Sequence, residues 1–185
     1  MFEQLARPGR DGKWMNWLAE SWSLKGTKDK PVIEVKLRPG VTFHNGDPLT
    51  SADMEFSFQR QKNPKISRRF YFFDSVDRFE IVDDLTFRIH FKEPDANFVA
   101  AYFHLYAMPK KYIEQVGEEE FAKNPVGTGP WKFRSWKPKE EMVFEEGRPV
   151  NASFLDFAVP RIGSAPKIVG RPCGSRCVVT RPRGL

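Results

Sequence analysis

The sequence predicts an α/β fold of the mixed α+β kind, in which short strands, a β-hairpin and several short helices follow one another in irregular order. Three observations support this. Val32–Arg38 alternates apolar and charged residues, Val76–Phe91 holds two alternating runs around a pair of aspartates, and residues 48–61 begin with helix-starting residues. No internal repeat or low-complexity run is present.

In Val32–Arg38, three aliphatic side chains alternate with three charged ones. Period two is typical of a strand that buries one face. Pro39-Gly40 then turns the chain, and Asn45-Gly46 marks a second tight turn. We therefore expect a strand followed by a compact, turn-rich segment.

A helix is predicted to start at Thr50, whose hydroxyl can cap the first turn. Asp53 follows three residues later, where a carboxylate favours a helix N-terminus. Met54 and Phe58 share one helical face, whereas Phe56 points nearly opposite. Because both faces carry apolar side chains, we expect this helix to lie between two layers.

Val76–Phe91 is predicted to form a β-hairpin, because alternating apolar residues flank a turn at Asp83-Asp84. His90 falls on the polar face of the second strand. We interpret His90 as a solvated side chain rather than a ligand.

Residues 95–108 have the composition of a helix that packs against a core, with Pro109 closing it. The run Lys110–Val116 is expected to form a short helix that Gly117 ends in the left-handed conformation. Residues 118–124 then lead into a loop rich in proline and glycine.

That loop, Asn124–Phe133, reads NPVGTGPWKF. Pro125 and Pro130 fix φ and lack an N–H donor, while Gly127 and Gly129 allow positive φ or a close backbone approach. Such a loop defines a rigid turn and leaves amides free to face a ligand. A structural crossover and a ligand-binding loop both fit the pattern.

The formal charge of +6 lies entirely in residues 147–185, which hold seven basic residues and one acid. Residues 1–146 hold 23 basic and 23 acidic residues. A nucleic-acid surface needs a basic stripe on the folded part, which a neutral body does not supply. A salt-sensitive contact of the tail alone with nucleic acid is the remaining alternative. No apolar stretch approaches the roughly 20 residues that span a bilayer.

Metal, cofactor and catalytic roles are not expected. Cys173 and Cys177 fall short of a four-ligand zinc site. His44, His90 and His104 stand far apart in the sequence, and residues 1–146 contain neither a serine elbow nor a cysteine nucleophile.

Five motifs stand in the order and rough spacing of one family. They are Leu18–Ser23, Val35–Arg60, Val76–Pro94, Met108–Gly117 and Phe121–Pro138. The chain closely resembles the family 5 extracellular solute-binding proteins, which are the peptide, dipeptide and nickel receptors of ABC importers. The resemblance covers roughly residues 2–145.

The resemblance implies a partial periplasmic-binding-protein-like lobe. Residues 1–146 correspond mostly to the smaller subdomain of the first lobe, and Asn124–Phe133 is the crossover that returns the chain toward the sheet beside the cleft. The expected partners are a peptide or another small solute and the permease subunits of an ABC transporter. The full-length parent is expected in the periplasm, although Met1–Trp17 shows no signal peptide.

Residues 147–185 depart from the family. They are rich in arginine, proline and glycine, and we interpret them as an atypical basic tail, either disordered or produced by a frameshift. The family's continuation in another reading frame of the coding DNA would support a frameshift.

A solute receptor needs a concave surface with aromatic faces and a few polar groups. Arg68 or Arg69 is expected to pair with a solute carboxylate, and Tyr71 to pack against the solute. The other candidates are His104 and Tyr106 at the end of the predicted helix, and Gly127, Thr128 and Gly129 in the crossover. The alternative is that the neighbouring phenylalanines form core and both arginines lie on the surface.

Overall fold

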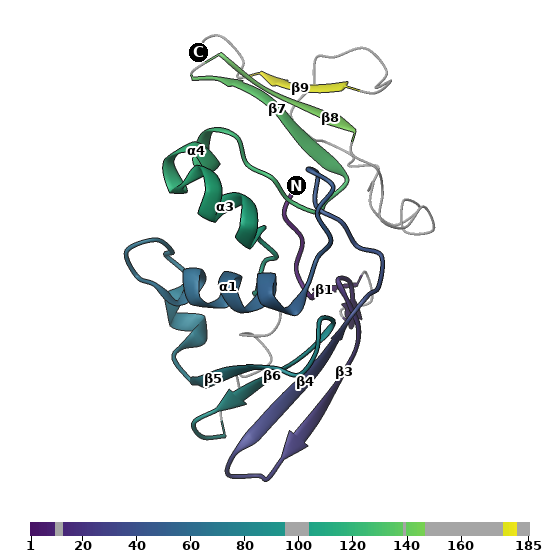
Figure 1. Ribbon diagram of the computed structural model, residues 1–185, viewed down its shortest axis with the longest axis vertical. Coiled ribbons are helices and arrows are strands. Elements are labelled where there is room, and N and C mark those ends of the chain that lie inside the picture. Colours follow the sequence, from purple (N-terminus) through teal and green to yellow (C-terminus); the bar gives the residue numbers. More distant parts are fainter. Residues whose placement is uncertain (10–12, 95–103, 139, 147–175, 181–185) are drawn as a thin grey trace.

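The computed structural model describes residues 1–9, 13–94, 104–138, 140–146 and 176–180. Within these ranges the molecule is elongated, with a four-stranded sheet at one end, a three-stranded sheet at the other and helices between them (Figure 1). This arrangement confirms the predicted mixed α/β class.

The four-stranded sheet is antiparallel throughout, in the order β3-β4-β6-β5. Its strands are β3 (Ala19–Gly26), β4 (Pro31–Leu37), β5 (Val76–Ile81) and β6 (Thr86–Phe91). The predicted strand and the predicted hairpin are therefore both confirmed, and they lie side by side because β4 pairs with β6.

The inner face of this sheet forms the main core. Its fully buried side chains come from alternate positions of β4 and β6, as period two requires. They are Ile33, Val35, Leu37, Phe87, Ile89 and Phe91.

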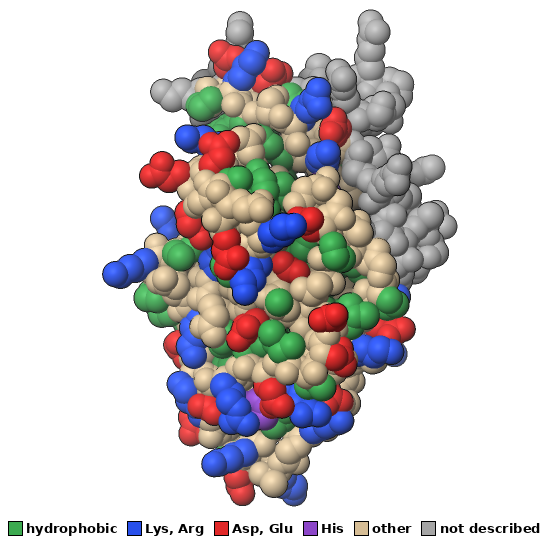
Figure 2. Space-filling view, viewed as in Figure 1, with side chains coloured by type: hydrophobic (Ala, Val, Ile, Leu, Met, Phe, Trp, Pro, Cys, Tyr) green, Lys and Arg blue, Asp and Glu red, His purple; other side chains and the backbone are tan. Residues whose placement is uncertain are grey.

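The outer face of the sheet, which points away from α1, carries a ladder of alternating charges. Glu34 forms ion pairs with Lys25 at 2.6 Å and with Arg88 at 2.8 Å. Arg88 also reaches Glu80 at 3.2 Å. Positive and negative side chains accordingly intermix over the lower part of the molecule in Figure 2.

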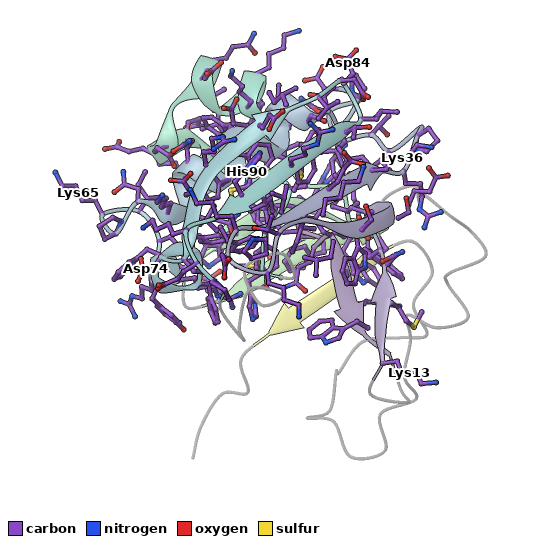
Figure 3. The ribbon with its side chains drawn as sticks, turned by 90° about the horizontal axis from the view of Figure 1, so that it is seen from below. Lys13, Lys36, Lys65, Asp74, Asp84 and His90 are labelled. Carbon is purple, nitrogen blue, oxygen red and sulfur yellow. The ribbon has the colours of Figure 1, made fainter. Side chains whose placement is uncertain are left out.

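His90 lies on this outer face as predicted, near the middle of the sheet viewed from below (Figure 3). It is not simply solvated, because its side chain is only 16% exposed and its Nε2 lies 2.5 Å from a Glu80 carboxylate oxygen. The antiparallel register pairs Glu80 with Arg88, which brings the neighbouring His90 within reach of the same carboxylate.

Helix α1 (Ser51–Lys62) lies between the four-stranded sheet and α3 (Lys110–Val116), which confirms its predicted place between two layers (Figure 1). The Asp53 carboxylate accepts the Thr50 amide at 3.0 Å and the Thr50 hydroxyl at 2.7 Å. Its other oxygen accepts the Lys110 amide at 2.9 Å. One buried carboxylate therefore caps α1 and ties it to the start of α3.

Gly117 has φ 82° and ψ 166°, so it is not the left-handed cap that the sequence predicts. Its amide donates to Ile113 and its carbonyl accepts from Phe121, so the glycine ends α3 and begins a further helix, α4 (Glu118–Lys123). An extended ψ is needed here because the chain changes direction between two helices rather than entering a loop.

Three strands form the far sheet in the antiparallel order β7-β8-β9. They are β7 (Trp131–Lys137), β8 (Glu141–Glu146) and β9 (Arg176–Thr180). Strand β9 belongs to the basic tail, whose other residues lie outside the described ranges. Near the N-terminus, β1 (Ala6–Pro8) pairs with β2 (Trp14–Asn16).

Most of the helix predicted for residues 95–108 lies outside the described ranges. The described end of that segment is extended rather than helical. Tyr106 forms an isolated bridge with Gln4, and the Ala107 amide donates to the Glu3 carbonyl at 3.1 Å. The N-terminal segment thus takes the backbone hydrogen bonds that a helix would use. In the described part of the chain, no helix is long and apolar enough to cross a membrane.

Candidate functional site

An aromatic cluster of Tyr71, Phe72 and His104 forms where the short 3-10 helix η1 (Phe70–Phe73) meets residues 104–108. The Phe72 ring stacks on His104 with centroids 4.1 Å apart, and the Tyr71 ring lies 4.4 Å from Phe72. Tyr71 is 56% exposed. The cluster therefore offers an aromatic face to solvent on a packed base.

Arg69 lies beside this cluster and is held in place by Tyr106. Its Nη1 donates to the Tyr106 hydroxyl at 2.7 Å, and its guanidinium carbon lies 5.2 Å from that ring's centroid. Gln61 fixes Tyr106 in turn, because its side-chain amide donates to the Tyr106 carbonyl at 3.1 Å. Among the residues that the structure describes, no carboxylate lies within ion-pair distance of Arg68 or Arg69.

Arg68, Arg69 and Tyr106 line one pocket of about 330 Å³. The other residues that line it are Phe2, Arg60, Gln61, Ile66, Ser67 and Met108. Five predicted site residues therefore gather on one surface, since Tyr71 and His104 meet through Phe72 next to Arg69.

The His104 imidazole stays neutral near pH 7. Burial lowers its pKa, and the nearby Arg69 cation lowers that pKa further. Its Nδ1 is buried and has no hydrogen-bond partner among the described residues. A neutral ring can donate from one nitrogen and accept at the other, so the ring keeps hydrogen-bonding capacity that no described residue uses.

The crossover residues Gly127, Thr128 and Gly129 lie apart from that cluster, against His44. The His44 amide donates to the Gly127 carbonyl at 2.8 Å. The imidazole adds two contacts, with Nε2 lying 2.6 Å from the Gly129 carbonyl and Nδ1 accepting the Gly127 amide at 3.3 Å. Because a carbonyl only accepts and an amide only donates, the Nε2 atom carries the proton and His44 is neutral.

Close backbone approach, and not positive φ, explains the two crossover glycines. Neither has a positive φ. The Gly129 amide donates to the Met1 carbonyl at 2.8 Å. A Cβ on Gly127 would lie 2.4 Å from the Met1 carbonyl oxygen, and one on Gly129 would lie 2.7 Å from it. The N-terminal segment therefore passes directly over the crossover, as Figure 1 shows.

Thr128 points inward and is 2% exposed. Its hydroxyl lies close enough to the Glu3 carboxylate to lower the pKa of that group, although burial is the larger influence and raises it. Neither this hydroxyl nor Glu3 Oε2 makes a hydrogen bond of regular geometry within the described ranges. The amides of Gly127 and Gly129 are already used inside the chain, so the crossover is braced internally.

His44 is a structural support of the crossover that the sequence did not single out. It lies beside the Asn45-Gly46 turn but contacts residues more than 80 positions away. No local pattern signals such a contact. The only indication in the sequence is indirect, because a rigid crossover needs some distant side chain to hold it in position.

We expect His44→Gln to lower the free energy of unfolding by about 2 kcal/mol, because a buried amide and a buried carbonyl lose well-placed partners. The substitution should also change how the free energy of unfolding depends on pH. Burial lowers the pKa of His44 below 6.5. As the pH falls through 6.5, the unfolded chain therefore takes up a proton that the folded chain does not, and stability falls.

Urea unfolding of the wild type and of His44→Gln, at pH values above and below 6.5, measures both effects. His104 contributes a slope of the same sign, so the relevant quantity is the difference between the two proteins. Identical slopes would show that His44 is not the neutral bridge described here.

Residues 13–149 match the model of the family described as "Bacterial extracellular solute-binding proteins, family 5 Middle". The chain belongs to this family. The resemblance that the motifs indicated is therefore confirmed.

Two relatives illustrate the match. The glutathione-binding protein GsiB of Pectobacterium atrosepticum is 34% identical over 140 residues, which is 74% of this chain and 27% of the relative. The dipeptide-binding protein DppE of Bacillus subtilis is 26% identical over 169 residues, covering 79% of this chain and 30% of the relative.

Solved structures agree. NikZ from Campylobacter jejuni, in complex with Ni(L-His), superposes with a TM-score of 0.74 at 25% identity, covering 97% of this chain and 33% of that one. The oligopeptide-binding protein AppA of Bacillus subtilis, in complex with a nonapeptide, superposes with a TM-score of 0.72 at 27% identity. The match covers 81% of this chain and 32% of AppA. The chain thus spans about a quarter to a third of the length of these proteins.

Members of this family are binding receptors of ABC importers, not enzymes, and they work in the periplasm or outside the cell. The names of these relatives describe solute binding, so the comparisons do not favour the alternative of nucleic-acid binding through the tail. In the described ranges, no group of histidine, cysteine or acidic residues is arranged to hold a metal ion.

Proposed function

We propose that residues 1–146 form the smaller subdomain of the first lobe of a periplasmic receptor, which captures a peptide or another small solute and passes it to the permease subunits of an ABC importer. Support comes from the family match and from relatives named for binding glutathione and dipeptides. The same family match supports a periplasmic location for the parent.

The observation that carries the proposal is the surface shared by Arg69, Tyr106 and the aromatic cluster. Arg69 is held by the Tyr106 hydroxyl yet has no carboxylate partner among the described residues. A guanidinium that is held in place in this way can bind a solute carboxylate through two parallel hydrogen bonds. Arg68 lines the same pocket and adds a second positive charge. Tyr71 and His104 then pack against the body of the solute.

Gly127, Thr128 and Gly129 have a supporting part in this proposal. Their backbone is fixed by His44 and by the N-terminal segment. A fixed crossover sets the direction in which the chain leaves this subdomain toward β7, and so the angle at which the rest of the lobe meets the solute.

A chimera tests the proposed site in a two-lobed protein. Residues 13–146 replace the matching part of the Pectobacterium glutathione-binding protein, and glutathione binding is measured by calorimetry. We expect Tyr71→Ala and His104→Ala to weaken binding by about tenfold each, which corresponds to about 1.4 kcal/mol of lost aromatic contact.

Trp136→Ala is the matched control, because Trp136 is 53% exposed and Tyr71 is 56% exposed, but Trp136 lies on β7 away from the cluster. It should leave affinity unchanged. Circular dichroism confirms that each variant is folded. Unchanged affinity in Tyr71→Ala and His104→Ala would remove both residues from the site.

A further inference from the structure

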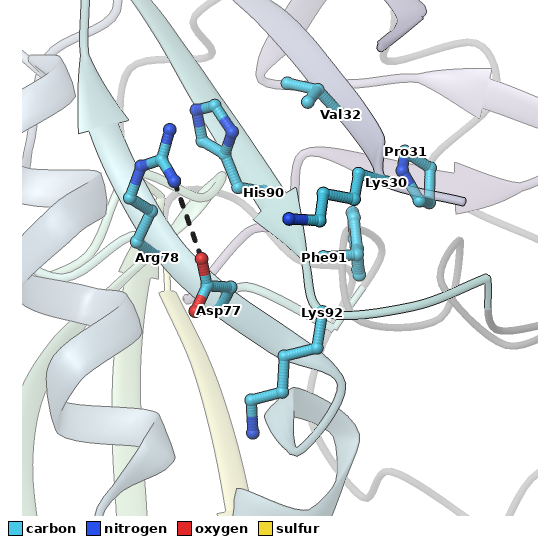
Figure 4. A pocket seen from close by; sticks show the side chains of 8 residues that line it. All are labelled: Lys30, Pro31, Val32, Asp77, Arg78, His90, Phe91 and Lys92. Carbon is cyan, nitrogen blue, oxygen red and sulfur yellow. Dashed lines mark hydrogen bonds and ion pairs between the residues drawn. The ribbon is translucent and has the colours of Figure 1, made fainter. Parts of the chain in front are cut away.

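A second concave region of about 330 Å³ lies on the outer face of the four-stranded sheet, where Lys30 precedes β4 and where β5 begins (Figure 4). Three of its lining residues occupy paired positions on adjacent strands. Val32 of β4 is paired with His90 of β6, and His90 is paired with Arg78 of β5. The region therefore rests on a rigid, hydrogen-bonded base.

A β-bulge directs two charged side chains into this region. Val76 pairs with Phe91 and Arg78 pairs with His90, so Asp77 has no partner position on β6. Bulges of this kind re-aim side chains at the end of a strand. Asp77 and Arg78 both become exposed on the outer face, where an unbroken register would place them on opposite faces.

Positive charge is in excess here. Lys30, Arg78 and Lys92 line the region together with one carboxylate, that of Asp77. The ion pair between Arg78 and Asp77 is long, at 3.5 Å. Lys92 donates to the Asp74 carbonyl at 2.8 Å, and no carboxylate of the described residues forms an ion pair with it. Within the described ranges, Lys30 has no acidic partner.

The rest of the outer face has no such excess. Lys25 and Arg88 are each paired with Glu34, and Lys36 is paired with Glu20 at 2.9 Å. His90 is paired with Glu80. Because the cations elsewhere on this face are matched, the unmatched charge is a local property of the bulged end of the sheet.

We propose that this region binds a small oxyanion, either inorganic phosphate or the phosphate group of an ester. The Arg78 guanidinium supplies a planar fork of donors, which matches phosphate geometry. Lys30 reaches toward the same space from the turn before β4, and its backbone is fixed by a hydrogen bond from its amide to Thr27 Oγ1 at 3.2 Å (Figure 4). Concave walls strengthen the field of unmatched cations.

This oxyanion site is separate from the proposed solute site. It lies on the outer face of the sheet, whereas the aromatic cluster lies against η1 and the segment 104–108. Its occupant is accordingly not the transported solute. Failure of either proposal leaves the other standing.

The test is an NMR titration of the chain with sodium phosphate at low ionic strength, with sodium chloride at matched ionic strength as the reference. We expect the amide signals of Val32 and Arg78 to shift saturably with phosphate alone. Arg78→Gln and Lys30→Gln should each weaken binding by about fivefold, because each removes one charge and its hydrogen bonds.

Lys65→Gln is the matched control, since it removes one positive charge from an exposed lysine that does not line the region and that lies at the edge of the molecule in Figure 3. It should leave the affinity for phosphate unchanged. Phenyl phosphate in a parallel titration distinguishes the source, because tighter binding than inorganic phosphate assigns the site to an ester.

Three results would each overturn the proposal. They are equal shifts in chloride, absence of saturation with both phosphate and phenyl phosphate, and a loss of affinity in Lys65→Gln as large as that in Arg78→Gln. Arg78 is 62% exposed, so its replacement leaves the core intact, and a folded amide spectrum confirms this.

Discussion

Gly127→Ala is expected to lower the free energy of unfolding by about 3 kcal/mol, because the added methyl group meets backbone rather than a movable side chain. The new Cβ would lie 2.4 Å from the Met1 carbonyl oxygen. Relief requires the N-terminal segment to move off the crossover, which breaks the hydrogen bond from the Gly129 amide to Met1. Urea unfolding measures the loss.

Gly40→Ala is the control for this substitution. Gly40 has φ 77° and open space around its Cα, so alanine there costs only backbone strain, about 1 kcal/mol. Gly127 has no such strain but has the steric conflict. If Gly127→Ala proved no more destabilising than Gly40→Ala, the close approach described here would be wrong.

Phe58→Ala is expected to cost about 3–5 kcal/mol, the range for removing a buried aromatic ring. Phe58 is 2% exposed and belongs to the hydrophobic core that α1 shares with the sheet. Its ring contacts Phe73 edge-on at 5.7 Å and stacks on Phe79 at 5.7 Å. Phe73 belongs to η1, so the substitution also loosens the base of the aromatic cluster.

Phe56→Ala on the same helix serves as the comparison. Phe56 is only half-buried, and helical periodicity places it nearly opposite Phe58 on α1. We expect a loss of about 1 kcal/mol there. Equal losses at positions 56 and 58, measured by chemical denaturation, would contradict the orientation of α1 given above.

The periodic elements were predictable from the sequence because their signals are local. Val32–Arg38 shows its buried face in its own alternation, and Val76–Phe91 shows both strands and its turn. The prediction of a two-sided helix followed from Met54 and Phe58 on one face and Phe56 on the other. Each of these patterns depends on residues within a few positions of one another.

Elements that depend on distant partners were not predictable. Residues 104–108 are apolar enough for a helix, but the N-terminal segment pairs with Tyr106 and Ala107 instead. His90 was interpreted as solvated because nothing in its own strand reveals Glu80 on the neighbouring one.

In the candidate site, the residue types were likewise predictable from the sequence, whereas the contacts between distant residues were not. Arg68, Arg69 and Tyr71 lie close together in the sequence, and their chemistry suggested a solute-binding role although no contact was known. The hydrogen bond from Arg69 to Tyr106 spans 37 positions and became visible only in the fold. The same holds for the bulge at Asp77, since bulges arise from pairing rather than from composition.

The central claim is that this chain supplies one side of a binding cleft whose other side belongs to the rest of a two-lobed receptor. Calorimetric titration of glutathione into the isolated chain and into the chimera with the Pectobacterium relative tests it most directly. We predict weak binding or none for the isolated chain, and binding at least about a hundredfold tighter for the chimera, because one lobe cannot exclude water from the solute. Micromolar binding by the isolated chain would contradict the claim.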